Sequence, residues 1–290
     1  MPGTSPSRPS SPAASRRLIP ARAGERLLKV AGWTLVALIV GFIILPAVVV
    51  GISAFNDRAI LSFPPQAWST RWFQRAFSYR DFAIGFRNGL IITAFASTIA
   101  LAVGAGFAFA LDRYRFTGKA TLEAILTSPL VIPHFTIGLG FLILAAQIHA
   151  TRTYWLVILC HVVLVLPFVM RSVYVSLRNL DGRLELAAAS LGAKPGMALW
   201  TVTLPLLVPG LFSGWLFAAI LSFNEFTASL FVTAQSTQTL PVAMYNYVRE
   251  YADPTLAALS VVYIVVTAGV LTLANAFLGL GKVLNVEHAR

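Results

Sequence analysis

The sequence has few charged residues: Asp, Glu, Lys and Arg together make up 11% of its 290 positions, and only eleven residues are acidic. Soluble globular domains carry charge on about a quarter of their residues. The hydrophobic content of 57% and the mean hydropathy of +0.76 agree with this shortage. The composition therefore excludes an ordinary soluble domain and predicts a membrane protein.

Cysteine is almost absent. The single cysteine, Cys160, lies inside an apolar run. One thiol cannot form an internal disulfide or a thiolate metal site. We interpret Cys160 as a residue of the packed interior.

The residues that catalysis or cofactor binding would require are also missing. Neither Gly118-Lys119 nor Gly281-Lys282 has the preceding glycine or the following Ser or Thr of a phosphate-binding loop. The four histidines have no i, i+4 pairing on a helix face and no acidic companion, so we expect no metal site; they are His134, His149, His161 and His288. Without a cluster of catalytic side chains, we predict that the chain is not an enzyme and binds no cofactor itself.

What the sequence does contain is long uncharged stretches, each close to the ~20 residues that cross a bilayer. The six predicted spans lie between Lys29 and Asp57, between Arg87 and Asp112, between Glu123 and Arg152, from Arg152 through Arg171 toward Val175, from about Leu206 to Val232, and from Pro254 to Gly281. Pro129 and Pro133 predict a kink in the third span. The predicted fold is an all-α membrane protein with six transmembrane helices.

The predicted domain organisation follows from these spans. Residues 1–28 are rich in Pro, Ser, Ala and Arg and predict a disordered cytoplasmic tail. Residues 29–285 form the transmembrane domain, whose first span we interpret as an uncleaved anchor. Residues 286–290 form a cytoplasmic C-terminal end.

Basic residues are unevenly distributed between the two sides of the predicted membrane. The net charge of +11 lies in short loops rather than in a basic soluble domain, which argues against a nucleic-acid partner. Fifteen of the 22 arginines and lysines fall on the side of the N-terminus. Since basic loops stay in the cytoplasm, we predict a multi-pass protein of the cell membrane, embedded in lipid, with a cytoplasmic N-terminus.

Residues 179–205 are too polar to span and predict a helical hairpin. Leu184, Ala187, Ala188 and Leu191 follow at i, i+3, i+4 and i+7, and so form one low apolar face. Gly192 supplies the positive φ that ends a helix, and Pro195 suits the first turn of a second helix.

The hairpin carries a family resemblance. Ala187-Ala188, Gly192, Val202, Leu204 and Pro205 have the spacing of the EAA loop of ABC-transporter permease subunits. The family's glutamate position is occupied by Leu186, and Glu185 stands one residue earlier. The resemblance implies an ATPase-coupling loop made of Glu185, Leu186, Ala187, Ala188, Gly192, Leu204 and Pro205. The alternative is a simple amphipathic connector.

A second resemblance concerns the first external loop. Phe63-Pro64-Pro65, Trp68, Ser69, Arg71 and Trp72 resemble the loop of the permease branch that serves spermidine, putrescine and related small solutes. The two resemblances together imply the MetI-like permease fold of ABC importers. They also imply partners: a dimer of ATPase subunits that binds ATP and Mg, a second and different permease chain, and an extracytoplasmic solute-binding protein.

Glu225 lies inside the predicted fifth span, where an ionised carboxylate costs several kcal/mol. We hypothesise that Asn224 and Glu225 line a translocation pathway, and the resemblance supports this through a Ser-x-Asp/Asn-Glu-Phe segment. The alternative is a carboxylate near the outer end that packs against arginines of the first loop.

The predicted function is the permease subunit of an ATP-driven importer. The alternative is an ion-gradient-driven transporter or channel. Such proteins usually need several intramembrane charged residues or two repeated halves, whereas this sequence has one intramembrane acid and no evident internal repeat.

Overall fold

The structure is a computed structural model that describes residues 21–60 and 62–278. The chain divides into two compact units, residues 1–50 and 51–290. Helix α1 (Ala21–Ser53) contains the whole described part of the first unit. Its 33 residues measure about 50 Å at 1.5 Å per residue, more than the ~30 Å of a hydrocarbon core. α1 begins inside the predicted tail. Residues 1–20 and the predicted C-terminal end lie outside the described residues.

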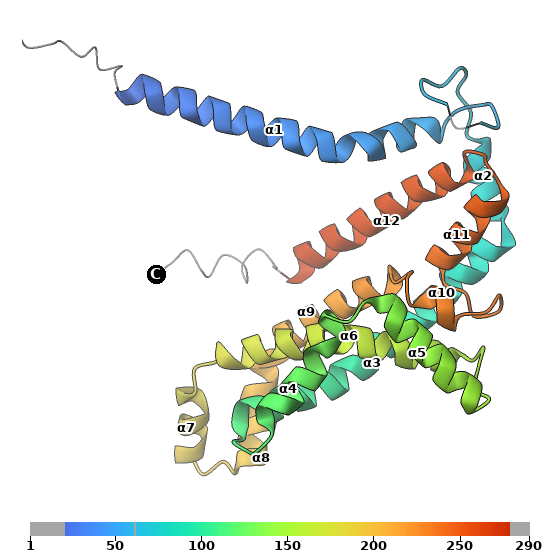
Figure 1. Cartoon of the computed structure of the whole chain (residues 1–290). Coiled ribbons are helices and arrows are strands. Elements are labelled where there is room, and N and C mark those ends of the chain that lie inside the picture. Colours follow the sequence, from blue (N-terminus) through green and yellow to red (C-terminus); the bar gives the residue numbers. More distant parts are fainter. Residues whose placement is uncertain (1–20, 61, 279–290) are drawn as a thin grey trace, which may run out of the picture. The chain divides into compact units, whose positions relative to one another are not determined.

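The second unit is helical throughout its described part, apart from turns and one isolated bridge between Asn56 and Trp68. Figure 1 shows its elements, which are α2 (Arg71–Ser78), α3 (Arg80–Arg113), α4 (Lys119–Thr127), the 3-10 turn η1 (Ser128–Leu130), α5 (His134–Gln147), α6 (Tyr154–Arg178), α7 (Arg183–Ser190), α8 (Pro195–Ala198), the π turn η2 (Leu199–Thr203), α9 (Leu204–Phe223), α10 (Ser229–Val232), α11 (Leu240–Glu250) and α12 (Thr255–Leu278). The prediction of an all-helical fold is confirmed.

The main core of this unit lies where α3, α6 and α9 pack against one another. Small residues bring the helices together, as is usual in membranes. A Cβ at Gly104 of α3 would lie 3.1 Å from Val169 of α6, and one at Gly210 of α9 would overlap the Ser176 hydroxyl. α9 is therefore held against α6 near the middle of its length.

Four described helices are long and apolar enough to cross a membrane, and a bent pair gives a fifth. The first member of the pair is Lys119–Leu130, which is α4 with η1, and the second is α5. The chain bends by 101° between them, across residues 131–133. The predicted proline kink in the third span is thus confirmed, because Pro133 lacks the N–H that would continue a helix. α6 runs through Arg171 to Arg178, as predicted. The predicted count of six spans remains a prediction.

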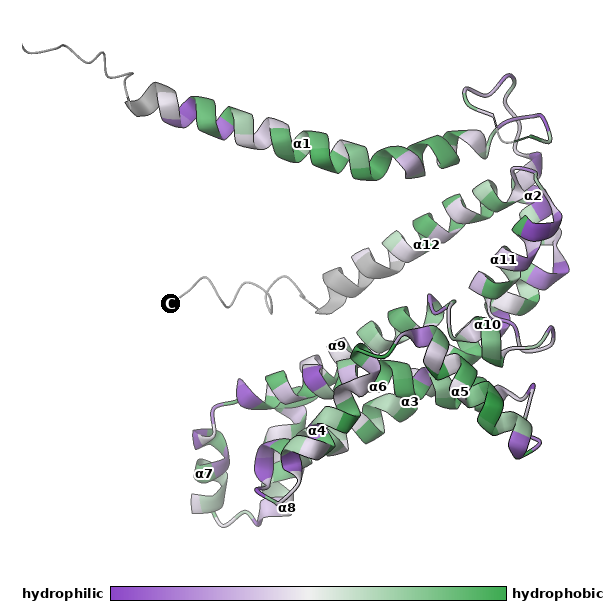
Figure 2. Ribbon diagram, in the orientation of Figure 1, coloured by the Kyte–Doolittle hydropathy of each residue, from purple (hydrophilic) through white to green (hydrophobic). Residues whose placement is uncertain are grey.

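The fifth predicted span ends earlier than expected. α9 stops at Phe223, and a turn separates it from the four-residue α10, so the prediction of one helix to Val232 with Glu225 inside it is wrong. At the end of α9 the Ile220 carbonyl accepts from both the N–H and the side-chain amide of Asn224. Figure 2 shows hydrophobic residues along α3, α6 and α9, and hydrophilic ones on α2 and around α7.

Candidate functional site

The predicted hairpin is present, with α7 and α8 as its two short helices. Gly192 has a φ of 88°, and the turn is closed by bonds from its N–H to Ala189 (2.9 Å) and from the Ala193 N–H to Ala188 (3.0 Å). Pro195 is the first residue of α8. The predicted roles of this glycine and this proline are confirmed.

The apolar side chains of the hairpin are uncovered. Leu191 is 91% exposed and Leu186 is 69% exposed, while Ala187 is exposed and Ala188 is half-buried. Leu186, which holds the family's glutamate position, therefore faces outward. An apolar patch at the tip of a polar hairpin indicates a surface for another protein.

Glu185 faces the transmembrane helices rather than the exterior. Its carboxylate accepts a 2.7 Å bond from Arg113 Nη1, a second bond from Arg113 Nη2, and a third from the Thr203 hydroxyl. Arg113 is the last residue of α3 and Thr203 belongs to the π turn η2. Glu185 thus ties α7 to two neighbouring elements, and we refer to Arg113, Glu185 and Thr203 as the hairpin clamp.

The second arm of the hairpin continues into a membrane helix without a break. α8, η2 and α9 form one helix from Pro195 to Phe223, 29 residues long. Leu204 and Pro205 lie inside it, where the π turn accommodates the proline that cannot donate to the preceding turn. A force on the hairpin is therefore carried directly along α9.

The hairpin clamp should weaken in acid. The Arg113 guanidinium, helped by the Thr203 hydroxyl, holds the pKa of the Glu185 carboxyl below its ordinary value, although burial acts in the opposite sense. A lowered pKa means that the clamp stabilises the hairpin fully above pH ~4.3 and loses this effect as the pH falls through the lowered value. A fluorescent label at Ser190 should gain mobility, seen as lower anisotropy, only as the pH falls below ~4.3. Glu185→Gln should remove this pH dependence, and an unchanged transition in that variant would contradict the assignment.

Glu225 lies just beyond the end of α9 and caps α10. Its Oε1 accepts a 2.8 Å bond from the Ala228 N–H, and its Oε2 lies 2.8 Å from His134 Nδ1. His134 is the first residue of α5, directly after the bend. The expectation that no histidine has an acidic companion is therefore wrong, and the proposed alternative partner, an arginine of the first loop, is replaced by His134.

A second polar layer lies behind Glu225. The fully buried His161 of α6 contacts the Ser222 hydroxyl at 2.8 Å and the Ser229 hydroxyl at 2.9 Å. It thereby joins α6 to the end of α9 and to α10. A cavity of about 50 Å³ lies among His134, His161, Ser222 and Glu225, with apolar side chains on its other walls. This space has room for one or two water molecules at ~30 Å³ each.

Asn224 is not part of this cavity. Its Oδ1 accepts a 2.6 Å bond from the Tyr263 hydroxyl of α12. The structure brings Glu225 together with two histidines and places its neighbour against another helix. Within residues 21–60 and 62–278, no group of three or more His, Cys, Asp or Glu residues could hold a metal.

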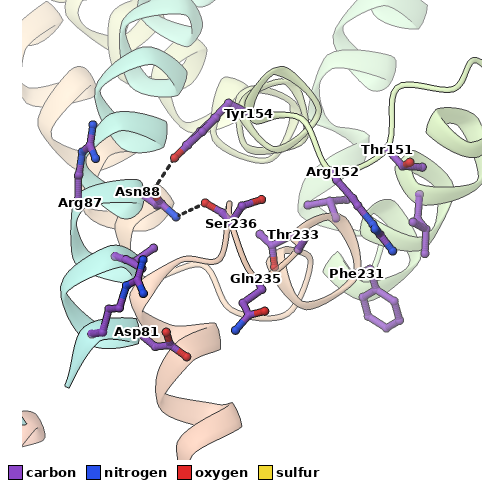
Figure 3. Close-up of a pocket in the computed structure, with 15 residues that line it drawn as sticks. Asp81, Arg87, Asn88, Thr151, Arg152, Tyr154, Phe231, Thr233, Gln235 and Ser236 are labelled. Atoms are coloured by element: carbon purple, nitrogen blue, oxygen red, sulfur yellow. Dashed lines mark hydrogen bonds between the residues drawn. The ribbon is translucent and has the colours of Figure 1, made fainter.

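A larger cavity of about 1160 Å³ opens near the start of α3. Asn88 organises its wall, because its Nδ2 donates to the carbonyls of Ser236 and Gln238, both at 3.0 Å, and its Oδ1 accepts from the Tyr154 hydroxyl at 2.7 Å. Figure 3 shows the bonds of Asn88 to Ser236 and to Tyr154. The loop that follows α10 is thus fixed to α3 and α6.

Several of these residues have no local signal in the sequence. Arg113 stands 72 positions from Glu185, and His134 stands 91 positions from Glu225. The one sign in the sequence that could have drawn attention to such residues is a polar residue within an apolar run, as at His161.

Comparison with known proteins gives a consistent result. The family described as "Binding-protein-dependent transport system inner membrane component" matches residues 100–280. The spermidine/putrescine transport system permease protein PotC of Haemophilus influenzae is 29% identical, over 81% of this chain and 91% of that protein. The putrescine transport system permease protein PotI of Escherichia coli is 34% identical, over 79% and 84%. A solved bacterial alginate ABC transporter, in complex with an alginate-bound periplasmic protein, shares the fold with a TM-score of 0.67 and 15% identity, over 87% of this chain and 94% of that chain.

Proposed function

This chain belongs to the family of binding-protein-dependent transport system inner membrane components, as a permease subunit of the polyamine branch of ABC importers, and from this we propose that its solute is a polyamine such as spermidine or putrescine. The names of the two relatives support this solute class. We assign ATP hydrolysis to partner ATPase subunits that bind ATP and Mg, and solute delivery to an extracytoplasmic binding protein. A second, different permease chain completes the pathway.

The observation that carries the proposal is the hairpin joined to a membrane helix. Leu184, Ala187 and Leu191 lie on one face of α7 and are exposed, and they form an apolar surface that suits the groove of a partner protein. We propose that an ATPase subunit holds this surface, with Gly192 shaping the turn. Leu204 and Pro205 then transmit its movement into α9, because the helix is unbroken from Pro195 to Phe223.

The proposed orientation places the N-terminus and the hairpin in the cytoplasm. The excess of arginine and lysine on that side supports it. A second observation concerns α3, because the clamp residue Arg113 lies at one end of this helix and Asn88 near the other. Their 25-residue separation corresponds to about 38 Å, more than the ~30 Å of hydrocarbon. We propose from this separation that the hairpin and the large cavity lie on opposite sides of the membrane.

We propose Glu225 as the carboxylate of the translocation pathway. Its position beyond the end of α9 links it to the hairpin through that helix, and His134 and the Ala228 N–H hold its two oxygens. An ammonium group of a polyamine can replace the His134 imidazole as the hydrogen-bonding partner of this carboxylate. Asn224 belongs to this proposal as the residue that fixes the end of α9 to α12.

The proposed function is tested by reconstitution. The chain, a second permease, ATPase subunits and a binding protein are incorporated into liposomes, and uptake of labelled spermidine is measured with and without ATP. We expect uptake that requires ATP and the binding protein. Uptake driven by an ion gradient without the ATPase would instead establish the secondary-transporter alternative.

A further inference from the structure

The large cavity carries an unusual set of charges. Its walls include three arginines, Arg80, Arg87 and Arg152, against a single carboxylate, Asp81. Among the residues that the structure describes, none of the three arginines makes an ion pair or a side-chain hydrogen bond. All three are exposed, so their charges are available to a partner.

The arginines come from different elements of a fixed frame. Arg80 and Arg87 belong to α3, and Arg152 belongs to the α5–α6 connection. Figure 3 shows Arg87 and Arg152 on opposite sides of the cavity, with Gln235 and Ser236 of the loop after α10 between them. Asn88, 2% exposed, bonds both this loop and Tyr154, so the walls are held apart before anything binds.

The chemistry of this cavity suits carboxylates. Guanidinium groups bind carboxylates through paired, charge-assisted hydrogen bonds. A polyamine carries only positive charge and is repelled here. Arginines on opposite walls suit a partner that presents more than one carboxylate, and a volume of about 1160 Å³ exceeds the ~300–1,000 Å³ of typical small-molecule sites.

We propose that this cavity receives acidic side chains of the extracytoplasmic solute-binding protein. The inference rests on the proposed function, which places the cavity on the extracytoplasmic side and requires such a protein to dock there. The arginines then fix the docked orientation and speed the encounter, as charges at the rim of an interface do.

The experiment uses the assembled transporter in nanodiscs, with ATPase activity measured at increasing concentrations of solute-loaded binding protein. Replacing Arg87 and Arg152 together with glutamine should raise the half-maximal concentration about tenfold or more, because two charge-assisted contacts are lost. The affinity of the variant should also depend less on salt. Basal ATPase activity should stay unchanged, which reports correct assembly. Arg58→Gln, an exposed loop residue outside the cavity, is the matched control.

Three outcomes separate the possibilities. An unchanged half-maximal concentration in an assembled double variant overturns the proposal. An unchanged affinity for the binding protein combined with slower uptake overturns it in favour of contact with the solute. Restored stimulation of an Arg152→Glu variant by a binding protein whose surface acids are replaced with lysine supports it. If the unmodified chain shows no ATP-dependent uptake at all, the proposed function fails rather than this inference.

Discussion

Glu225→Gln is expected to lower solute uptake about tenfold or more in membranes that contain the normal amount of assembled transporter. Glutamine keeps the shape of the side chain and an oxygen that can accept from the Ala228 N–H, so the cap of α10 survives. What it loses is the negative charge that lies against His134. Hydrogen bonds to charged groups contribute about 1.5–3 kcal/mol, which corresponds to roughly ten- to hundredfold in rate.

This substitution separates the two interpretations of Glu225. If the residue only caps α10, glutamine should transport nearly normally, and that result would exclude a role in the pathway. Glu123→Gln is the matched control, because Glu123 is an exposed glutamate on α4 whose carboxylate accepts no hydrogen bond within the described structure. His134→Ala should lower uptake as well, and the double variant should be little worse than Glu225→Gln alone if the two residues act as a pair.

Leu191→Glu is expected to lower the affinity of the permease for its ATPase subunits by a hundredfold or more. Leu191 is 91% exposed at the end of α7, so the substitution should leave the hairpin folded. Burying a leucine in a partner's groove contributes about 1.5–3 kcal/mol, and an unpaired carboxylate in the same place adds a further penalty. A loss of this size corresponds to a hundredfold or more in the dissociation constant.

The measurement is co-purification of the ATPase with the permease, followed by titration in nanodiscs. Leu191→Met retains an apolar side chain of similar volume and should bind normally. If Leu191→Glu retains the ATPase at full affinity, this face of the hairpin is not the docking surface. Normal docking without coupled uptake would instead point to a fault in transmission through α9.

The parts of the fold that the sequence predicts correctly depend on local chemistry. Gly192 ends α7 because a positive φ is inexpensive for glycine, and Pro195 begins α8 because its missing N–H is not needed in a first turn. The bend before α5 follows from Pro133 for a similar reason. Each of these signals acts over a few residues and is visible in the sequence.

The partners of the two acidic residues could not be found in that way. The motif groups Glu185 with the docking residues, yet Arg113 and Thr203 hold it against the helix bundle. The uncharged run on either side of Glu225 predicts a continuous helix, but α9 ends at Phe223. Such outcomes depend on which helices become neighbours, and a single sequence does not record this.

The close approach of Gly210 to Ser176 has a mechanical consequence. Gly210 lies near the midpoint of the continuous helix from Pro195 to Phe223, so a tilt of this helix about the contact would move its two ends in opposite directions. We expect an inward push on the hairpin end to swing the Glu225 end outward. Opening at one face of the membrane would then be obligatorily matched by closing at the other, with no separate device needed to keep both from being open together.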